Sequence, residues 1–325
     1  MVARTHPKAN VFDRAHDQRV RTAAFEWLRA QVDAHDDVLP WALLLQGFQL
    51  DGERVPLLSQ QGIFKPRVLS HAPLSIRSSP SGPYDDGFGA DDLLRYRYRF
   101  DGNDPSPDHA DNHRLRFAMR ERLPLVYFHG LVPGRYLASW PVFVVSDDPA
   151  TLTFAVAVDD RTHGLGLDVG PQVAVHDERA DIRRHYVTSA ERRRLHQHAF
   201  RERVLRAYRH QCAFCRFRHA ELLDAAHIVP DADTEGEPVV PNGLALCKLH
   251  HAAFDRHFLG VRPDLVVEVR PDLLREEDGP TLVHAIQRMQ GISIERAVPR
   301  KVELRPGAEF LERQYQRFLE GSAAR

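Results

Sequence analysis

The N-terminal stretch carries apolar residues at the spacing of one helix face. These residues are Val20, Ala24, Trp27, Leu28 and Val32. Steps of three and four residues are typical of an amphipathic helix. Asp13 has the side chain of a helix N-cap, and Pro40 ends the pattern. We therefore predict one helix between Asp13 and Pro40.

From residue 41 to about residue 180, the pattern changes to short apolar runs separated by Gly, Pro, Asp and Asn. The predicted strands are residues 41–45, 93–100, 125–129, 135–145 and 152–158. Two polar segments, residues 78–92 and 101–113, are predicted to be loops, and long loops on a rigid sheet often carry function. One helix followed by many short strands predicts a small curled sheet or barrel.

Residues 95–100 alternate strictly between arginine and an aromatic residue. In a strand, alternate residues lie on opposite faces, so one face holds three aromatics and the other three arginines. The aromatic face can pack in a core while the arginines face solvent. Alternatively, the arginine row follows a phosphate backbone. The pattern favours the first interpretation and leaves the second open.

The second part of the chain, from residue 183, begins with a strongly basic segment. Residues 183–218 hold eleven arginines and two glutamates, a local charge of +9 in a chain whose net charge is -1. Residues 189–209 within it have the apolar spacing of a helix. Such an excess of positive charge suits a polyanion partner, and a solvated helix face is the alternative. The arginines predicted to contact DNA are Arg192, Arg193, Arg194, Arg201, Arg216 and Arg218.

Two closely spaced pairs of metal-binding residue types follow, Cys212-x-x-Cys215 and Cys247-x-x-His250. Together they use all three cysteines of the chain. Two such pairs of sulfur and nitrogen ligands predict a tetrahedral zinc site. Because a closed four-ligand site has no open position, this zinc should stabilise the fold and take no part in chemistry. The alternative is three small buried cysteines without a metal.

His227, Asn242 and His251 occur in that order, at separations of 15 and 9 residues. Phosphodiester hydrolysis needs a base that activates water and a cation that stabilises negative charge. The near-neutral pKa of a histidine suits His227 to the role of base. His251 and Asp255 are four residues apart, so on a helix they share one face and can bind one divalent cation. Asn242 can hydrogen-bond backbone in both directions and can fix the loop that orients His227.

The motifs AHIVP, NGLALC and HHAAFD contain these three residues, and the chain from residue 208 to residue 260 resembles the HNH nucleases, the ββα-metal family. The resemblance implies that His227 is the base, His251 a ligand of the catalytic metal and Asn242 a positioning residue. Asp255 is the expected second ligand. The implied cofactors are a structural zinc and a catalytic Mg²⁺ or another divalent cation such as Mn²⁺, Co²⁺ or Ni²⁺.

One position departs from the family pattern. Many HNH enzymes carry a metal-binding acidic or histidine residue directly before the base, but this chain has Ala226 there. Asp224 lies three positions before His227, an odd offset that places it on the opposite face of a strand. We therefore expect a structural role for Asp224, with a metal role as the alternative. His257 is a further potential ligand, more simply explained as a surface histidine.

The β-rich first part precedes an HNH unit, and this arrangement is similar to bacterial restriction enzymes that target modified DNA. In those enzymes a base-flipping SRA or PUA-like barrel precedes the nuclease. The resemblance implies a DNA-recognition domain at residues 1–182 and a nuclease domain at residues 183–325. A flipped base needs an aromatic residue to stack on and a polar group at its pairing edge. Tyr84 and Asp85 can supply both, and an ordinary turn is the alternative.

Composition narrows the class of protein. The chain is 43% hydrophobic and 27% charged, which is typical of a folded protein, and its 325 residues fit about two domains. It has neither an apolar stretch of membrane-spanning length nor the apolar core of a signal peptide at its N-terminus, so we expect a cytoplasmic protein without a membrane partner. We also expect a homodimer, because one HNH site cuts one strand.

These observations together predict an α+β protein that cuts modified double-stranded DNA as a restriction endonuclease. Two alternatives remain open. One is an HNH nuclease of a mobile element or toxin with a protein-binding front domain. The other is a zinc-stapled DNA-binding module without catalysis, which would require broken base or metal positions.

Overall fold

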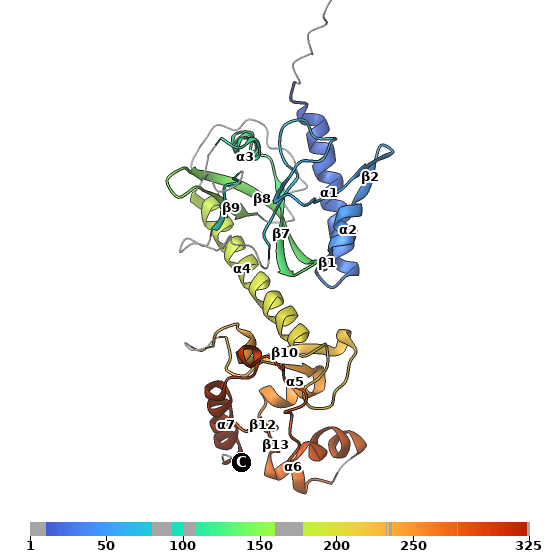
Figure 1. The fold of residues 1–325 in the computed structure, drawn as a ribbon, viewed down its shortest axis with the longest axis vertical. Helices are drawn as coiled ribbons and strands as arrows, with labels where there is room; N and C mark the ends of the chain where they lie inside the picture. The colour runs from blue at the N-terminus through green and yellow to red at the C-terminus, as the bar shows by residue number, and fades with distance from the viewer. Residues whose placement is uncertain are drawn as a thin grey trace, which may run out of the picture. The chain divides into compact units, whose positions relative to one another are not determined.

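The computed structural model describes residues 11–79, 93–100, 108–159, 178–231, 233, 236–277 and 279–323. The chain divides into two compact units, Met1–Leu195 and His196–Arg325. The boundary falls within one helix, α4 (Glu178–Ala207), shown in yellow-green in Figure 1. Within the described ranges, no helix is both long enough and apolar enough to cross a lipid bilayer.

The first unit is built on a seven-stranded sheet, whose main path runs β4-β5-β7-β8-β9-β6, with β1 paired to β8. Its strands are β1 (Val38–Pro40), β4 (Ile63–Phe64), β5 (Ser75–Arg77), β6 (Leu94–Arg97), β7 (Leu125–Val132), β8 (Arg135–Asp148) and β9 (Thr153–Val158). The β5–β7 ladder is parallel and the others are antiparallel. A separate hairpin pairs β2 (Phe48–Leu50) with β3 (Glu53–Val55).

The sheet curls along this path. Strand β6 is one end of the path, yet the Tyr96 hydroxyl donates to the Arg77 carbonyl of β5, near the other end, over 3.3 Å. Among the described residues, β4 and β6 are not paired, so the sheet is curled and its path is open there. The expected α+β fold with a curled N-terminal sheet is confirmed.

Helix α1 (Arg14–Ala34) forms as its sequence predicts. The Asp13 side chain caps it by accepting from the His16 N–H over 3.0 Å. The predicted apolar face is buried except for Trp27, which is partly buried. It packs in one core with β7 and β8 residues such as Phe128 and Trp140. Burial of this face supplies most of the stability that positions the helix on the sheet.

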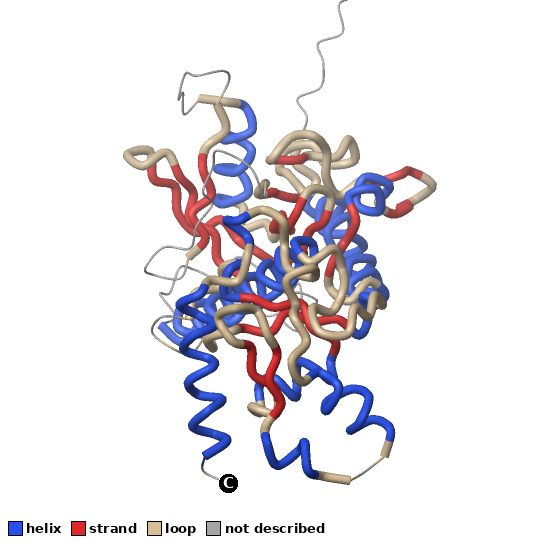
Figure 2. The backbone as a smooth tube through the Cα atoms, turned by 60° about the horizontal axis from the view of Figure 1, so that its bottom comes forward, coloured by secondary structure: helices blue, strands red, loops and turns tan. Residues whose placement is uncertain are grey.

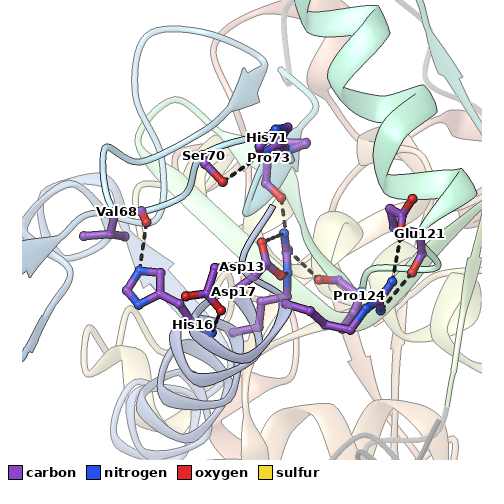
Figure 3. Close-up of polar contacts among 11 residues, drawn as sticks. Asp13, His16, Asp17, Val68, Ser70, His71, Pro73, Glu121 and Pro124 are labelled. Atoms are coloured by element: carbon purple, nitrogen blue, oxygen red, sulfur yellow. Dashed lines mark hydrogen bonds and ion pairs between the residues drawn. The ribbon is translucent and has the colours of Figure 1, made fainter. Parts of the chain in front are cut away.

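A buried ion pair fixes the first unit further. Arg21 and Asp17 lie one turn apart in α1, with 2% and 4% of their side chains exposed. Two nitrogens of the Arg21 guanidinium bond Asp17, and the third, NH1, donates to the carbonyls of Pro73 and Pro124, at 3.0 and 2.7 Å (Figure 3). The charge is therefore paired and its donors are satisfied, as burial requires.

Two predictions for the first unit were wrong. Residues 41–45 are not a strand but part of helix α2 (Trp41–Gln46), because a short apolar run has no period that separates the two. That helix ends at Gly47, whose positive φ and closeness to the Val55 carbonyl exclude a side chain. Helix α3 (Ala110–Arg120) begins inside the predicted loop 101–113. Its buried Asn112 bonds the backbone of Arg99, so a polar residue occupies a core position.

The alternating segment 95–100 buries its two tyrosines and leaves Phe100 partly exposed. Tyr96 and Tyr98 are 5% and 1% exposed, as the core interpretation predicts. Strand β6 itself ends at Arg97, which is exposed, and Arg99 pairs with Asp111 over 3.2 Å. The three arginines therefore differ in exposure and do not form one uniform, solvent-facing row.

The second unit contains the remainder of α4 and two hairpins. Its strands and longer helices are β10 (Leu223–His227), β11 (Gly243–Cys247), α5 (Lys248–Asp255), β12 (Leu259–Val261), β13 (Val267–Val269), α6 (Pro271–Arg275) and α7 (Ala308–Ala323). Short helical turns lie at Ala220–Leu222, Val240–Asn242, Leu282–Ile286, Gln287–Met289 and Val302–Leu304. Helix α7 ends the described chain, beside the C mark in Figure 2.

The β10–β11 hairpin and α5 form the ββα unit that the motifs predict (Figure 1). They share one apolar core with the C-terminal part of α4. A side chain at Gly243 would approach Val204 and Phe200 of α4 within 2.6 and 2.9 Å. Glycine at this position therefore lets α4 pack directly on the hairpin.

Candidate active site and metal cluster

The register of the hairpin places two kinds of chemistry at its two ends. Leu223 pairs with Cys247 at one end, and His227 pairs with Gly243 at the other. Asn242 directly precedes Gly243, so it lies beside His227 across the hairpin. The same strand β11 ends in Cys247 and leads into α5.

The two predicted ligand pairs come together in one cluster. The ligand atoms of Cys212, Cys215, Cys247 and His250 all lie within 4.8 Å of one another. His250 Nδ1 is 3.5 Å from Cys212 Sγ and 3.2 Å from Cys247 Sγ, and Cys215 Sγ is 4.0 Å from Cys247 Sγ. Zinc bonds of about 2.0–2.3 Å in a tetrahedron separate ligand atoms by roughly 3.3–3.8 Å. The cluster therefore has the donor set and the spacing to bind a metal such as zinc.

A hydrogen bond outside the cluster orients its histidine. His250 Nε2 is 2.7 Å from the Ala285 carbonyl, so it donates there and leaves Nδ1 for the sulfur side. Such a bond to the second ring nitrogen is typical of metal-binding histidines. His250 is only 1% exposed, which keeps water away from this side of the cluster.

His227 is held by stacking. Its ring lies parallel to that of Phe200 in α4, with the centroids 3.9 Å apart and the planes 12° apart. Burial lowers the pKa of His227, and the charge of His251 acts in the same direction, whereas Asp231, Asp255 and Asp224 oppose it. His227 Nε2 is buried and has no hydrogen-bond partner among the described residues. The lowered pKa keeps the imidazole neutral at pH 7, which is the form that a general base needs.

Asn242 makes the hydrogen bonds expected of it. It is fully buried, its Oδ1 accepts from the Val229 N–H over 2.8 Å, and its Nδ2 donates to the Val229 carbonyl over 2.9 Å. A third bond runs from Nδ2 to the Glu237 carbonyl. The amide thereby fixes the backbone two residues after His227.

His251 lies between two carboxylates. Its Nδ1 is 3.3 Å from Asp224 Oδ2, and its Nε2 is 3.2 Å from Asp255 Oδ2. Hydrogen bonds to Asp224 and then to Asp255 raise the pKa of His251 to about 9. The two carboxylates thus favour positive charge at this ring, and a cation bound to a ring nitrogen would take the place of the proton there.

The carboxylates reach different ring nitrogens, so they do not converge on one point. A cation held by His251 Nε2 and Asp255 would leave Nδ1–H donating to Asp224, the arrangement that commonly orients a metal-binding histidine. These side chains therefore fit one divalent cation, with open positions for other ligands.

Asp224, for which the sequence predicts a structural role, lies against His251. Helix α5 packs beside β10 and brings His251 to the Asp224 carboxylate. Strand alternation says only which face of β10 a residue occupies, and the position of α5 decides what that face meets. Burial opposes ionisation of Asp224, but its bonds with His251 and the Ala225 N–H, together with the charge of Arg201, hold its pKa below the ordinary value.

The predicted DNA-contacting arginines have different surroundings. Arg216 and Arg218 are exposed beside the metal cluster, and Arg193 is exposed on α4. Arg194 pairs with Glu191 and Asp37, at 2.6 and 3.2 Å. Arg201 contacts Asp224 and backbone carbonyls, and Arg192 is partly buried. Their role in DNA binding stays a prediction.

The remaining predicted site residues divide between the two units. His257 follows α5 with a positive φ and is half-buried, and a Cβ added at Gly321 of α7 would lie 3.6 Å from its side chain, so it is not a simple surface histidine. Burial lowers its pKa. Tyr84 and Asp85 lie outside the described residues. The predicted site did not include Phe200, although its four-residue spacing from Val204 and the glycine at position 243 were signals in the sequence.

Comparison with known proteins bears on the same segment. The family model described as HNH endonuclease matches residues 212–262. No curated protein matches the chain. Among solved structures, the chain is similar to the modification-dependent TagI restriction endonuclease, with 16% identity, a TM-score of 0.27, and 76% of this chain and 82% of that chain covered. It is also similar to ScoMcrA, a Type IV phosphorothioation-dependent restriction endonuclease, with 15% identity, a TM-score of 0.22, and 80% of this chain and 53% of that chain covered.

Those TM-scores are low, so neither structural likeness supports a conclusion about this chain. The family match contains the metal cluster, the predicted base, the asparagine and the two residues predicted to hold a cation. The second unit of this chain therefore carries an HNH endonuclease domain.

Proposed function

We propose that the chain is a divalent-cation-dependent DNA endonuclease in which His227 is the general base and His251 with Asp255 holds the cation. The observation that carries the proposal is the pair of differently tuned histidines. His227 is kept neutral by burial, whereas His251 lies between two carboxylates. Hydrolysis of a phosphodiester uses one site of each kind.

The chain's own residues supply most of the steps. Neutral His227 accepts a proton from water as the water oxygen forms its bond to phosphorus, and the bond from phosphorus to one ester oxygen breaks. Phe200 behind the ring and Asn242 behind the next two residues keep the imidazole in one orientation. Asp224 accepts from the second nitrogen of His251 and fixes that ring. The cation, when bound, stabilises the charge that develops on the phosphate and the departing oxygen.

The Cys212, Cys215, Cys247 and His250 cluster serves the fold in this proposal. It joins the segment after α4 to the end of β11 and the start of α5. We propose zinc as its metal because three sulfurs and one imidazole in a closed set suit zinc. His251 follows His250 directly, so the cluster also fixes where the cation-binding residues begin.

Recognition of modified DNA is the remaining part of the proposal. A curled sheet ahead of an HNH domain is the arrangement that the resemblance to modification-directed restriction enzymes implies. We propose that residues 1–182 read the modification and that the chain works in the cytoplasm as a homodimer, because one site cuts one strand. Light scattering of the chain with DNA tests the dimer.

Digestion of matched duplexes tests the proposal. The duplexes differ only in carrying cytosine, methylcytosine, hydroxymethylcytosine or phosphorothioate linkages. Each duplex is digested in the presence of Mg²⁺, Mn²⁺, Co²⁺ or Ni²⁺, and the cutting rates are compared. We expect cutting of one modified duplex, at least 100-fold slower in His227→Ala. The zinc content of that variant should stay at one per chain. Equal cutting of all duplexes would refute modification dependence, and wild-type cutting by His227→Ala would refute the mechanism.

The same duplexes separate the proposal from a mobile-element or toxin nuclease with a protein-binding front domain. Gel-shift binding by the full-length His227→Ala variant should prefer the duplex that the wild type cuts. Binding without any preference, together with unselective cutting, would favour the alternative.

A further inference from the structure

Arg201 of α4 contacts the same carboxylate as His251, that of Asp224, through the other carboxylate oxygen. Its NH2 group donates to the Leu223 carbonyl over 2.9 Å and lies 3.4 Å from the Ala220 carbonyl. Its Nε is 3.5 Å from Asp224 Oδ1, and its NH1 is 3.4 Å from Glu202. The guanidinium therefore holds both the backbone at the start of β10 and the carboxylate of the next residue.

Asp224 connects this arginine to the cation-binding residues. Its Oδ1 faces Arg201 and the Ala225 N–H, while its Oδ2 faces His251 Nδ1. Each carboxylate oxygen thus has its own partners, and the carboxylate cannot rotate without losing them. We propose that Arg201 is a positioning residue that holds Asp224 against His251. This inference rests on the proposed role of His251 as a cation ligand.

The alternative role for Arg201 is contact with a DNA phosphate. The nitrogens of Arg201 already face four acceptors, two carboxylates and two backbone carbonyls, and only 24% of its side chain is exposed. Few of its guanidinium N–H groups are therefore left to donate to a phosphate. Arg216 and Arg218 differ because both are exposed at the metal cluster and no acceptor faces them among the described residues. They remain the better residues for phosphate contacts.

The two roles predict different losses in Arg201→Gln. If Arg201 is a positioning residue, its loss should lower the single-turnover cutting rate at saturating DNA by about 10–100-fold. It should also weaken Mn²⁺ binding by a similar factor, as measured by calorimetry on the zinc-loaded chain. DNA affinity without added divalent cation, and its dependence on salt, should not change. Arg288→Gln is the matched control, since it removes an exposed arginine of the same unit and should leave all these quantities as in the wild type.

A phosphate contact would give the reverse pattern. The slope of log affinity against log salt would fall by about 0.9 for the lost contact, with the rate at saturating DNA unchanged. That result would overturn the inference. Arg216→Gln serves as the reference for such a change, because it is predicted to weaken binding and lower the slope.

Two further variants keep the test decisive if Arg201→Gln misfolds. Arg201→Lys keeps the charge but cannot hold the Leu223 carbonyl and Asp224 together, so its rate should fall between wild type and glutamine. In an Asp224→Asn background, Arg201→Gln should cause little further loss, because both act on the same ring. Fully multiplicative losses would overturn the inference. If the wild type itself cuts no DNA, the proposed function fails, and cutting by wild type and Arg201→Gln alike rejects this inference alone.

Discussion

Asn242 offers a direct test of how the base is held. Asn242→Ala removes three side-chain hydrogen bonds, two to the N–H and carbonyl of Val229 and one to the carbonyl of Glu237. Val229 is fully buried, so its two backbone groups would lose their partners without gaining water. Glu237 is exposed, and water can replace the bond to its carbonyl.

The size of the effect follows from those two buried groups. Each unsatisfied group costs about 1–3 kcal/mol, so the turn after His227 should lose roughly 2–6 kcal/mol. A whole domain is stable by only about 5–15 kcal/mol, so this turn should open often. Since His227 directly precedes the turn, its ring would lose its orientation, and an error of about 1 Å at a reacting group can cost about 100-fold in rate.

Hydrogen exchange of the Val229 amide, measured with single-turnover cutting at saturating DNA, checks both parts. Asn242→Ala should exchange faster and cut about 100-fold more slowly, with zinc still bound. Asn242→Asp has the same shape but faces two carbonyls with an oxygen, so it should be at least as damaging. Gln316→Ala, an exposed amide in the same unit, is the control. Wild-type exchange and rate in Asn242→Ala would show that the amide does not hold the base.

Three further predictions concern the base, the metal cluster and the buried ion pair. At a saturating cation concentration, where His251 has exchanged its proton for the metal, burial lowers the pKa of His227 below 6.5, so the cutting rate should stay level near pH 7 and fall only as pH drops through that lowered value; a pH–rate midpoint above 6.5 under these conditions would contradict this. Cys212→Ser should release the metal and lower the melting temperature of the second unit, and unchanged metal content and melting would argue against a structural role. Arg21→Leu leaves Asp17 buried without its partner and should destabilise the first unit by about 3–5 kcal/mol in urea unfolding, whereas Asp17→Asn in the same chain should recover part of the loss.

The sequence predicted those parts of the site whose partners are near in the chain or carry a fixed spacing. The four cluster residues, His251 with Asp255, and the backbone bonds of Asn242 are of this kind. The contacts made by α4 could not be predicted in this way. Phe200 reaches His227 and Arg201 reaches Asp224 only because α4 packs on the hairpin, and no local pattern states where a helix will dock.

The same limit explains the errors in the fold. An apolar run such as residues 41–45 satisfies a helix and a strand equally, and the contact of Gly47 with Val55, which ends the helix that forms there, is made only in the folded protein. Helix α3 was hidden because Asn112 fills a core position and bonds backbone there. Periodicity predicts an element well when its buried face is apolar, as in α1, and poorly when polar groups are buried with partners.

His250 and His251 are neighbours in α5, yet the proposed function places them in different sets of ligands. Successive helix residues point about 100° apart, so one ring turns to the sulfurs and the other to the carboxylates. Sulfur ligands favour zinc, whereas an imidazole with carboxylates accepts Mg²⁺ or Mn²⁺. In the proposed function, donor chemistry alone therefore gives each metal its own site. Because the sulfur cluster fixes the first turn of α5, it also fixes the place of His251 and Asp255. Loss of the structural metal should thus stop cutting even though no residue that touches the phosphate has changed.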